Sequence, residues 1–150
     1  MPLVTAPDNC YMVPRNTIYG LSAARVAHAV YSFAVDGGLV STIIVANNFI
    51  IPSGSIIYNA SINTTTGCTS GGAGTLSVGL TSPSSITSLC GATAIAQLGT
   101  ATFVQSVPVP QTATTWLKTT AVSSAQVAIG TAALTAGVVE IYVFYFESST

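Results

Sequence analysis

Charged side chains are scarce in this chain of 150 residues. It has three Lys or Arg residues, four Asp or Glu residues and one His, and charged residues make up 5% of the sequence, whereas soluble domains normally contain about a quarter. From Gly37 to Leu117 no charged residue and no His occurs. The net charge of −1 excludes electrostatic attraction to nucleic acid or to an anionic membrane as the main basis of function. A surface of hydroxyl, amide and backbone groups gives a free monomer little charge repulsion and suits a protein that other protein covers.

Residues for catalysis or metal binding are equally few. His28 is the only histidine, and the acids are Asp8, Asp36, Glu140 and Glu147. Metal sites need several His, Cys, Asp or Glu ligands, and a hydrolase with paired carboxylates would have to recruit two of these four acids. We therefore expect no enzyme, no metal and no cofactor.

The cysteine count and the N-terminal residues bear on the cellular compartment. Cys10, Cys68 and Cys90 are an odd number without CxxC spacing, which favours buried thiols in a reducing compartment. A bond between Cys68 and Cys90 is the alternative if their strands are neighbours. Residues 1–8 have neither a basic segment nor a long apolar segment, so we expect no secretory signal.

The most apolar part of the chain, residues 128–146, approaches the hydropathy of a membrane span. Glu140 and the break at Thr135-Ala136-Gly137 interrupt it, and its aromatic and β-branched residues are typical of a strand. We expect no transmembrane helix.

The proline pattern separates two regions. Residues 1–26 contain Pro2, Pro7 and Pro14 and show no sustained alternation, which predicts an extended N-terminal arm. A short helical turn over residues 22–26 is compatible with this arm. Residues 27–150 then form the body.

The body is predicted to be all-β. Short apolar runs alternate with turn signals at intervals of about 8–12 residues, a pattern typical of a single-domain β-sandwich or jelly roll. The expected strands cover residues 30–35 (ending at the turn signal Asp36-Gly37-Gly38), 39–45, 49–51, 55–62, 75–80, 102–107, 116–120, 126–129 and 138–146. Residues 67–74 are expected to form a loop, and residues 86–98 are ambiguous because Ile95–Leu98 could form one helical turn.

The last predicted strand has two apolar faces. Alternation places Val139, Ile141, Val143 and Tyr145 on one face and Val138, Glu140, Tyr142, Phe144 and Phe146 on the other. Because one face of a sandwich strand meets the core, the second face has to meet an arm, a loop or another subunit. We favour a subunit interface.

Four segments considered together resemble small virion structural proteins of tailed bacteriophages, of the kind that cement or decorate the capsid shell. They are Tyr31–Gly38, Ile51–Ile57, Ser70–Leu80 and Leu134–Val143. The resemblance lies in the order of turns and strands, over residues 30–146. It implies a β-rich body, present in many copies on the capsid exterior after assembly in the bacterial cytoplasm. It also implies the major capsid protein as partner and a homo-oligomer, a trimer rather than a dimer, with neither nucleic acid nor membrane bound.

Two surfaces are candidates for the capsid or subunit interface, namely the arm and one face of the last strand. The residues concerned are Pro2, Leu3, Val4, Pro7, Tyr11, Pro14, Arg15, Tyr142, Phe144 and Phe146. The alternative function is a tail or fibre component that binds host-surface glycans through exposed aromatic residues such as Trp116.

Overall fold

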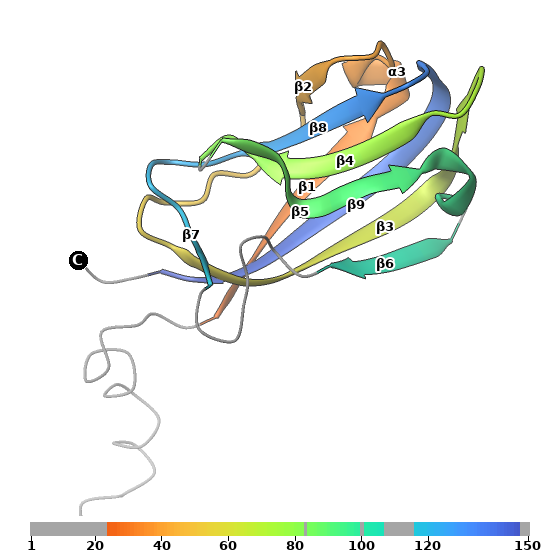
Figure 1. Cartoon of the computed structure of the whole chain (residues 1–150). Coiled ribbons are helices and arrows are strands. Elements are labelled where there is room, and N and C mark those ends of the chain that lie inside the picture. Colours follow the sequence, from red (N-terminus) through yellow and green to blue (C-terminus); the bar gives the residue numbers. More distant parts are fainter. Residues whose placement is uncertain (1–23, 83, 100, 107–115, 148–150) are drawn as a thin grey trace, which may run out of the picture.

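The computed structural model describes residues 24–82, 84–99, 101–106 and 116–147, and these form two antiparallel sheets packed face to face (Figure 1). The predicted all-β sandwich body is confirmed. Most of the predicted arm, residues 1–23, lies outside the described residues. The helical turn that was compatible with the sequence of residues 22–26 does not form at residues 25 and 26, because Arg25 and Val26 begin the first strand.

The strands are divided unequally between the sheets. The five-stranded sheet has the order β1 (Arg25–Ser32), β9 (Leu134–Phe146), β3 (Ile56–Ser70) and β6 (Thr102–Ser106), with β7 (Leu117–Lys118) also paired to β3. The four-stranded sheet has the order β2 (Thr42–Ile44), β8 (Ala125–Gly130), β4 (Thr75–Leu80) and β5 (Ser85–Ala94). One helical turn, α3 (Phe33–Asp36), follows β1, and one 3₁₀ turn, η1 (Ile95–Gln97), follows β5.

The antiparallel pairs are nested along the chain. β4 pairs with β5, β3 with β6, β2 with β8, and β1 with β9. The chain is therefore a long two-stranded ribbon whose successive parts lie alternately in the two sheets. This nesting brings the beginning and the end of the body side by side, as β1 and β9 (Figure 1).

The core lies between the sheets and follows the period-2 alternation of the strands. On β9, alternate residues from Val139 to Tyr145 are buried, as predicted. They meet buried residues of β4 and β8 and of the neighbouring β1 and β3, among them Tyr31, Ile57, Ile62, Leu76, Val78, Leu80, Val127 and Ile129.

The first predicted strand is displaced. We expected a strand over residues 30–35, but β1 ends at Ser32 and the next four residues form α3. The physical reason is Asp36, whose Oδ2 accepts a hydrogen bond from Ser32 N at 2.8 Å and whose Oδ1 accepts one from Ala46 N at 2.7 Å. These local bonds compete with continuation of the strand. The expected turn is present, and Gly37 has a φ of +80°.

A buried tyrosine secures the same turn. The hydroxyl of Tyr31 donates a hydrogen bond to the carbonyl of Gly37 at 2.7 Å. The pKa of Tyr31 is raised to about 12. Burial is the main cause, and the nearby Cys68 and Asp36 contribute in the same direction. The hydroxyl therefore stays protonated and remains a donor at every physiological pH.

Several strand boundaries also differ from the prediction. β3 continues to Ser70, so the expected loop over residues 67–74 shrinks to residues 71–74, because register shifts allow β3 to follow β9 as far as Leu134. Residues 49–51 form only an isolated bridge from Ile51 to Ser123. The strands expected over residues 39–45 and 116–120 are reduced to β2 and β7. The ambiguous residues 86–98 divide into β5 and η1.

Cys68 and Cys90 are both buried free thiols. Burial raises the pKa of Cys68 and so keeps its thiol protonated. Cys10 lies outside the described residues.

Within the described ranges, none of the helical segments has the length and apolar character needed to cross a membrane.

Gly137 provides a test of the β3–β9 pairing. Its φ is +143°, and a Cβ at this position would lie 2.6 Å from the Sγ and 3.1 Å from the Cα of Cys68. Gly137→Ala should therefore lower the free energy of unfolding by at least about 2 kcal/mol, measured by urea denaturation. Gly71→Ala is the control, because a Cβ there meets nothing within 4 Å. Equal stability of both variants would contradict this account.

Candidate interaction surface

The face of the five-stranded sheet that points away from the core carries several aromatic residues and a small polar cluster. On β9 this face has Val138, Glu140, Tyr142, Phe144 and Phe146, all half-buried although the opposite sheet does not cover them. The sequence predicted this division of β9 into two faces, and the structure confirms it. We use the name outer sheet face for these five residues together with Val26, His28, Ile56, Tyr58, Asn63, Phe103 and Trp116.

A β-bulge in β3 directs Tyr58 onto this face. Ile57 pairs with Tyr145 and Asn59 with Phe144, so Tyr58 is an extra residue without a partner on β9. Its ring stacks on Phe146 at a centroid distance of 4.7 Å and lies 6.3 Å from Phe144. The three rings form one aromatic group contributed by two strands.

A second stacked pair lies further along the sheet. His28 on β1 is directly opposite Tyr142 on β9, and their ring centroids are 4.6 Å apart. Directly opposed side chains on one face of an antiparallel pair are close enough to stack. His28 therefore serves as part of this surface, next to Val26, which is exposed.

Trp116 belongs to the outer sheet face at the side of β7. It directly precedes Leu117, which is buried and pairs with Ile57, so alternation directs Trp116 away from the core. Trp116 is half exposed. On the other side of β3, Phe103 of β6 is opposite Asn63 and is also exposed.

A small polar cluster interrupts the aromatic residues. Asn63 Nδ2 donates to Glu140 Oε2 at 2.9 Å, and the hydroxyl of Tyr142 donates to the same oxygen at 3.0 Å. The hydrogen bond from Asn63 is the main reason why the pKa of Glu140 is lowered. The hydrogen bond from Tyr142 and the nearby His28 act in the same direction. The bond to Glu140 raises the pKa of Tyr142. The carboxylate is thus held in place by neutral donors.

The structure places the predicted interface residues as follows. Tyr142, Phe144 and Phe146 come together on the outer sheet face. Pro2, Leu3, Val4, Pro7, Tyr11, Pro14 and Arg15 lie outside the described residues. Sequence reasoning missed Tyr58 and His28, because their neighbours on β9 follow from the pairing of distant strands and from a bulge that has no local signal.

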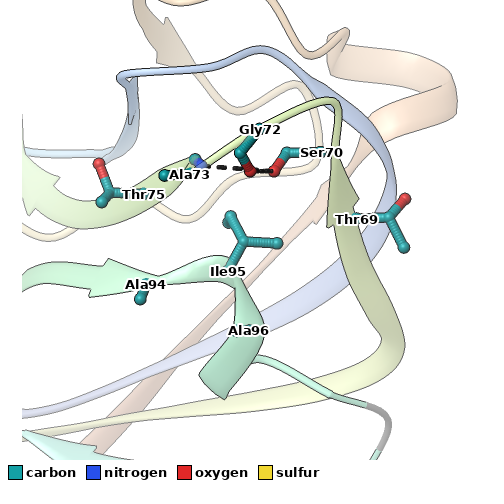
Figure 2. Close-up of a pocket in the computed structure, with 9 residues that line it drawn as sticks. Thr69, Ser70, Gly72, Ala73, Thr75, Ala94, Ile95 and Ala96 are labelled. Atoms are coloured by element: carbon teal, nitrogen blue, oxygen red, sulfur yellow. Dashed lines mark hydrogen bonds between the residues drawn. The ribbon is translucent and has the colours of Figure 1, made fainter.

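A second feature is an open pocket of about 530 Å³ next to the β3–β4 turn (Figure 2). It is lined by Thr69, Ser70, Gly72, Ala73, Gly74, Thr75, Ala94, Ile95 and Ala96. None of these side chains is charged. In the described part of the chain, no group of three His, Cys, Asp or Glu residues could hold a metal ion.

Comparison with known proteins shows which solved structures share this fold. No family model matches the chain, and no curated protein does. Several solved structures match, including the following three. A chain in the cyanophage Pam1 capsid is 18% identical with a TM-score of 0.60, and the match covers 97% of this chain and 99% of that one. A chain in the acid-stable capsid of Helicobacter pylori bacteriophage KHP30 is 14% identical with a TM-score of 0.60, covering 86% and 91%. A chain in the capsid of Ralstonia phage GP4 is 16% identical with a TM-score of 0.53, covering 93% and 91%.

This chain shares its fold with chains of three phage capsids. The match runs over most of both chains in each pair. At sequence identities of 14–18% the likeness shows a shared fold. It does not assign a role to individual surface residues.

The Glu140 cluster predicts a pH dependence. Because the pKa of Glu140 is lower in the folded state, its contribution to stability is present above its ordinary pKa and is lost as the pH falls through the lowered value. Thermal unfolding from neutral to acidic pH should show a smaller acid-induced loss of stability for Glu140→Gln than for the unaltered protein. Asn63→Ala, which removes the first donor, should reduce the loss in the same direction. Identical pH profiles for all three proteins would contradict this assignment.

Proposed function

We propose that this protein is a non-enzymatic structural component of a tailed-phage virion that cements or decorates the capsid. In this role it bridges major capsid protein subunits through apolar and neutral hydrogen-bonded contacts. The observation that carries the proposal is the fold shared with a chain of the Pam1 capsid over 97% of this chain and 99% of that one. The proposed location is the capsid exterior, after assembly in the host cytoplasm.

We infer that the body is a jelly roll. With the short β7 set aside, the sheets have the orders β1-β9-β3-β6 and β2-β8-β4-β5. A two-stranded ribbon whose nested pairs alternate between the sheets has this arrangement, and it contains the two Greek keys of a jelly roll. The pairing of the strands within two packed sheets gives a body that can present its faces to neighbours.

The outer sheet face is the proposed attachment surface. It contains the stacked rings of Tyr58, Phe144 and Phe146 beside a polar cluster whose side chains bond to one another. Aromatic residues are enriched at the interfaces between proteins. A contact of about 800 Å² per partner is enough for specific attachment. Because each copy bridges neighbouring subunits, weak contacts add across the lattice.

The N-terminal arm is proposed as a second attachment element. Its backbone groups can pair with an open strand edge of the shell protein, as in recognition by strand addition. The residues concerned are Pro2, Leu3, Val4, Pro7, Tyr11, Pro14 and Arg15. β1, which follows the arm, lies at the edge of the sheet that carries the outer sheet face.

Copy number tests the proposed function. Quantitative mass spectrometry of purified particles should find this chain in hundreds of copies, in a simple ratio to the major shell protein. A few to a few tens of copies per particle would instead favour the tail or fibre alternative, in which exposed Trp116 and its neighbours bind glycans. Absence from particles would overturn both.

Attachment itself should be insensitive to salt, because few charges are available. Binding of purified protein to particles stripped of it should be unchanged from low to near-molar salt. Phe144→Lys should weaken this binding by at least tenfold, since loss of one central aromatic contact costs about 2 kcal/mol or more. Val122→Lys is the control, because Val122 is exposed in a different part of the body.

The arm is tested in the same assay. Deletion of residues 2–16 should abolish binding while the body keeps its unfolding midpoint. Binding that salt removes, or that survives both Phe144→Lys and the deletion, would overturn this assignment of the surfaces.

A further inference from the structure

One oxygen of the Glu140 carboxylate on the outer sheet face has no partner. Oε2 accepts hydrogen bonds from Asn63 Nδ2 at 2.9 Å and from the hydroxyl of Tyr142 at 3.0 Å. Among the described residues, none bonds to Oε1 or forms an ion pair with this carboxylate. Glu140 is half-buried, and Oε1 is not one of the unpaired polar atoms that the fold buries. Oε1 is therefore open to a partner.

Glu140 carries its charge at the centre of the sheet. β9 lies between β1 and β3, and Glu140 is opposite Val30 on one side and Asn63 on the other. The hydrogen bonds to Oε2 lower the pKa of Glu140, so the carboxylate is ionised at neutral pH. A partner that covers the outer sheet face therefore also covers this charge.

Covering an ionised carboxylate is unfavourable unless a cation pairs with it. The charge loses its hydration when protein covers it, and neutral hydrogen bonds compensate for only part of that loss. The donors of Asn63 and Tyr142 are neutral, and both bind the same oxygen. Stable attachment through this face therefore requires a cation at Oε1.

The cations of the described body do not supply this charge. Arg25 is engaged in its ion pair near the end of β9. Lys118 is opposite Ile56, about 20 Å along β3 from Asn63 at a rise of about 3.3 Å per residue. His28 lies closer, but its ring stacks on its neighbour in β9, and no hydrogen bond between described residues joins it to the carboxylate. The cation therefore comes from outside the described body.

A guanidinium suits this position better than an ammonium. The carboxylate lies among aromatic side chains, because Tyr142 stacks on His28 and Phe144 follows on the same face of β9. Arginine is planar and weakly hydrated, and it stacks on aromatic rings while it donates hydrogen bonds to a carboxylate. The ammonium of lysine is strongly hydrated and would lose more of its hydration on entering this surface.

We propose that an arginine of the major capsid protein pairs with Oε1 of Glu140 when the outer sheet face meets the shell. This inference rests on the proposed function and adds one charged contact to its apolar and neutral contacts. A pair enclosed between two proteins is screened little by salt, so it agrees with salt-insensitive attachment. Such a pair selects the partner and fixes its position on the face.

The direction in which Glu140→Gln changes binding tests this pair. In the binding assay with stripped particles, Glu140→Gln should weaken attachment at least tenfold, because the arginine is then covered without a counter-charge. Glu140→Lys should weaken attachment further by repulsion. Glu147→Gln is the matched control, because it removes an equal charge outside the outer sheet face, and it should bind normally. Without an opposing cation, Glu140→Gln would remove an unfavourable buried charge and bind as well as the unaltered protein or better, which would overturn the inference.

Chemical blocking of the particles identifies the cation. Stripped particles whose arginines are blocked with butanedione should bind the unaltered protein at least tenfold more weakly, whereas particles with acetylated lysines should bind it normally. The particles are treated before mixing, so the cations of this chain stay intact. Loss of binding only after acetylation would overturn the arginine assignment. Coupling between Arg15→Gln and Glu140→Gln in a double-variant cycle would place the cation in the arm and overturn it as well.

The failure of this pair and the failure of the proposed function are distinguishable. If Phe144→Lys weakens binding and Glu140→Gln does not, the attachment surface stands and only the pair fails. If the chain is absent from particles, the proposed function fails and the pair fails with it. Circular dichroism checks that each variant is folded, and Glu140→Ala, with the same expected weakening, replaces a Glu140 variant that is not.

Discussion

Strands β3 and β9 pair from Ile56 opposite Phe146 to Ser70 opposite Leu134, and every other strand of their sheet attaches to one of these two. The pairing fixes both faces of β9 at once. One face closes the core, and the other receives Tyr58 through the bulge in β3 and His28 through β1. Because side chains alternate strictly along a strand, a slip of one residue would exchange the buried and outer residues of β9. The core and the candidate surface therefore depend on the same register.

Most of the charged residues in the described body form local bonds. Asp36 joins the end of β1 to the residues after β2, Glu140 accepts two neutral donors, and Arg25 forms an ion pair with Glu147 at 3.1 Å. That ion pair is largely exposed and contributes little to stability. With so few charges, long-range electrostatics gives this surface little power to steer partners or to repel like copies. Contacts made by such a surface have to rely mainly on shape, apolar area and neutral hydrogen bonds.

The sequence predicted the parts of the fold that depend on local alternation. β4 matches its predicted bounds, and the two faces of β9 follow directly from period 2. The predicted strand was wrong at residues 33–35, where the chain forms α3 and Asp36 makes hydrogen bonds that hydropathy does not register. It also could not place Tyr58 or His28 on the candidate surface, because that requires knowing which distant strands pair. The alternation of β9 pointed to Tyr142, Phe144 and Phe146, but the arm residues rested on composition alone.

The outer sheet face has a consequence for the proposed assembly. It belongs to the side of the sandwich formed by β1, β9 and β3, which the opposite sheet does not cover. In the proposed function many copies attach to one shell, so each contact can be weak while the assembly is stable. Weak neutral contacts also leave single copies free to separate before assembly, which a strongly adhesive surface would prevent.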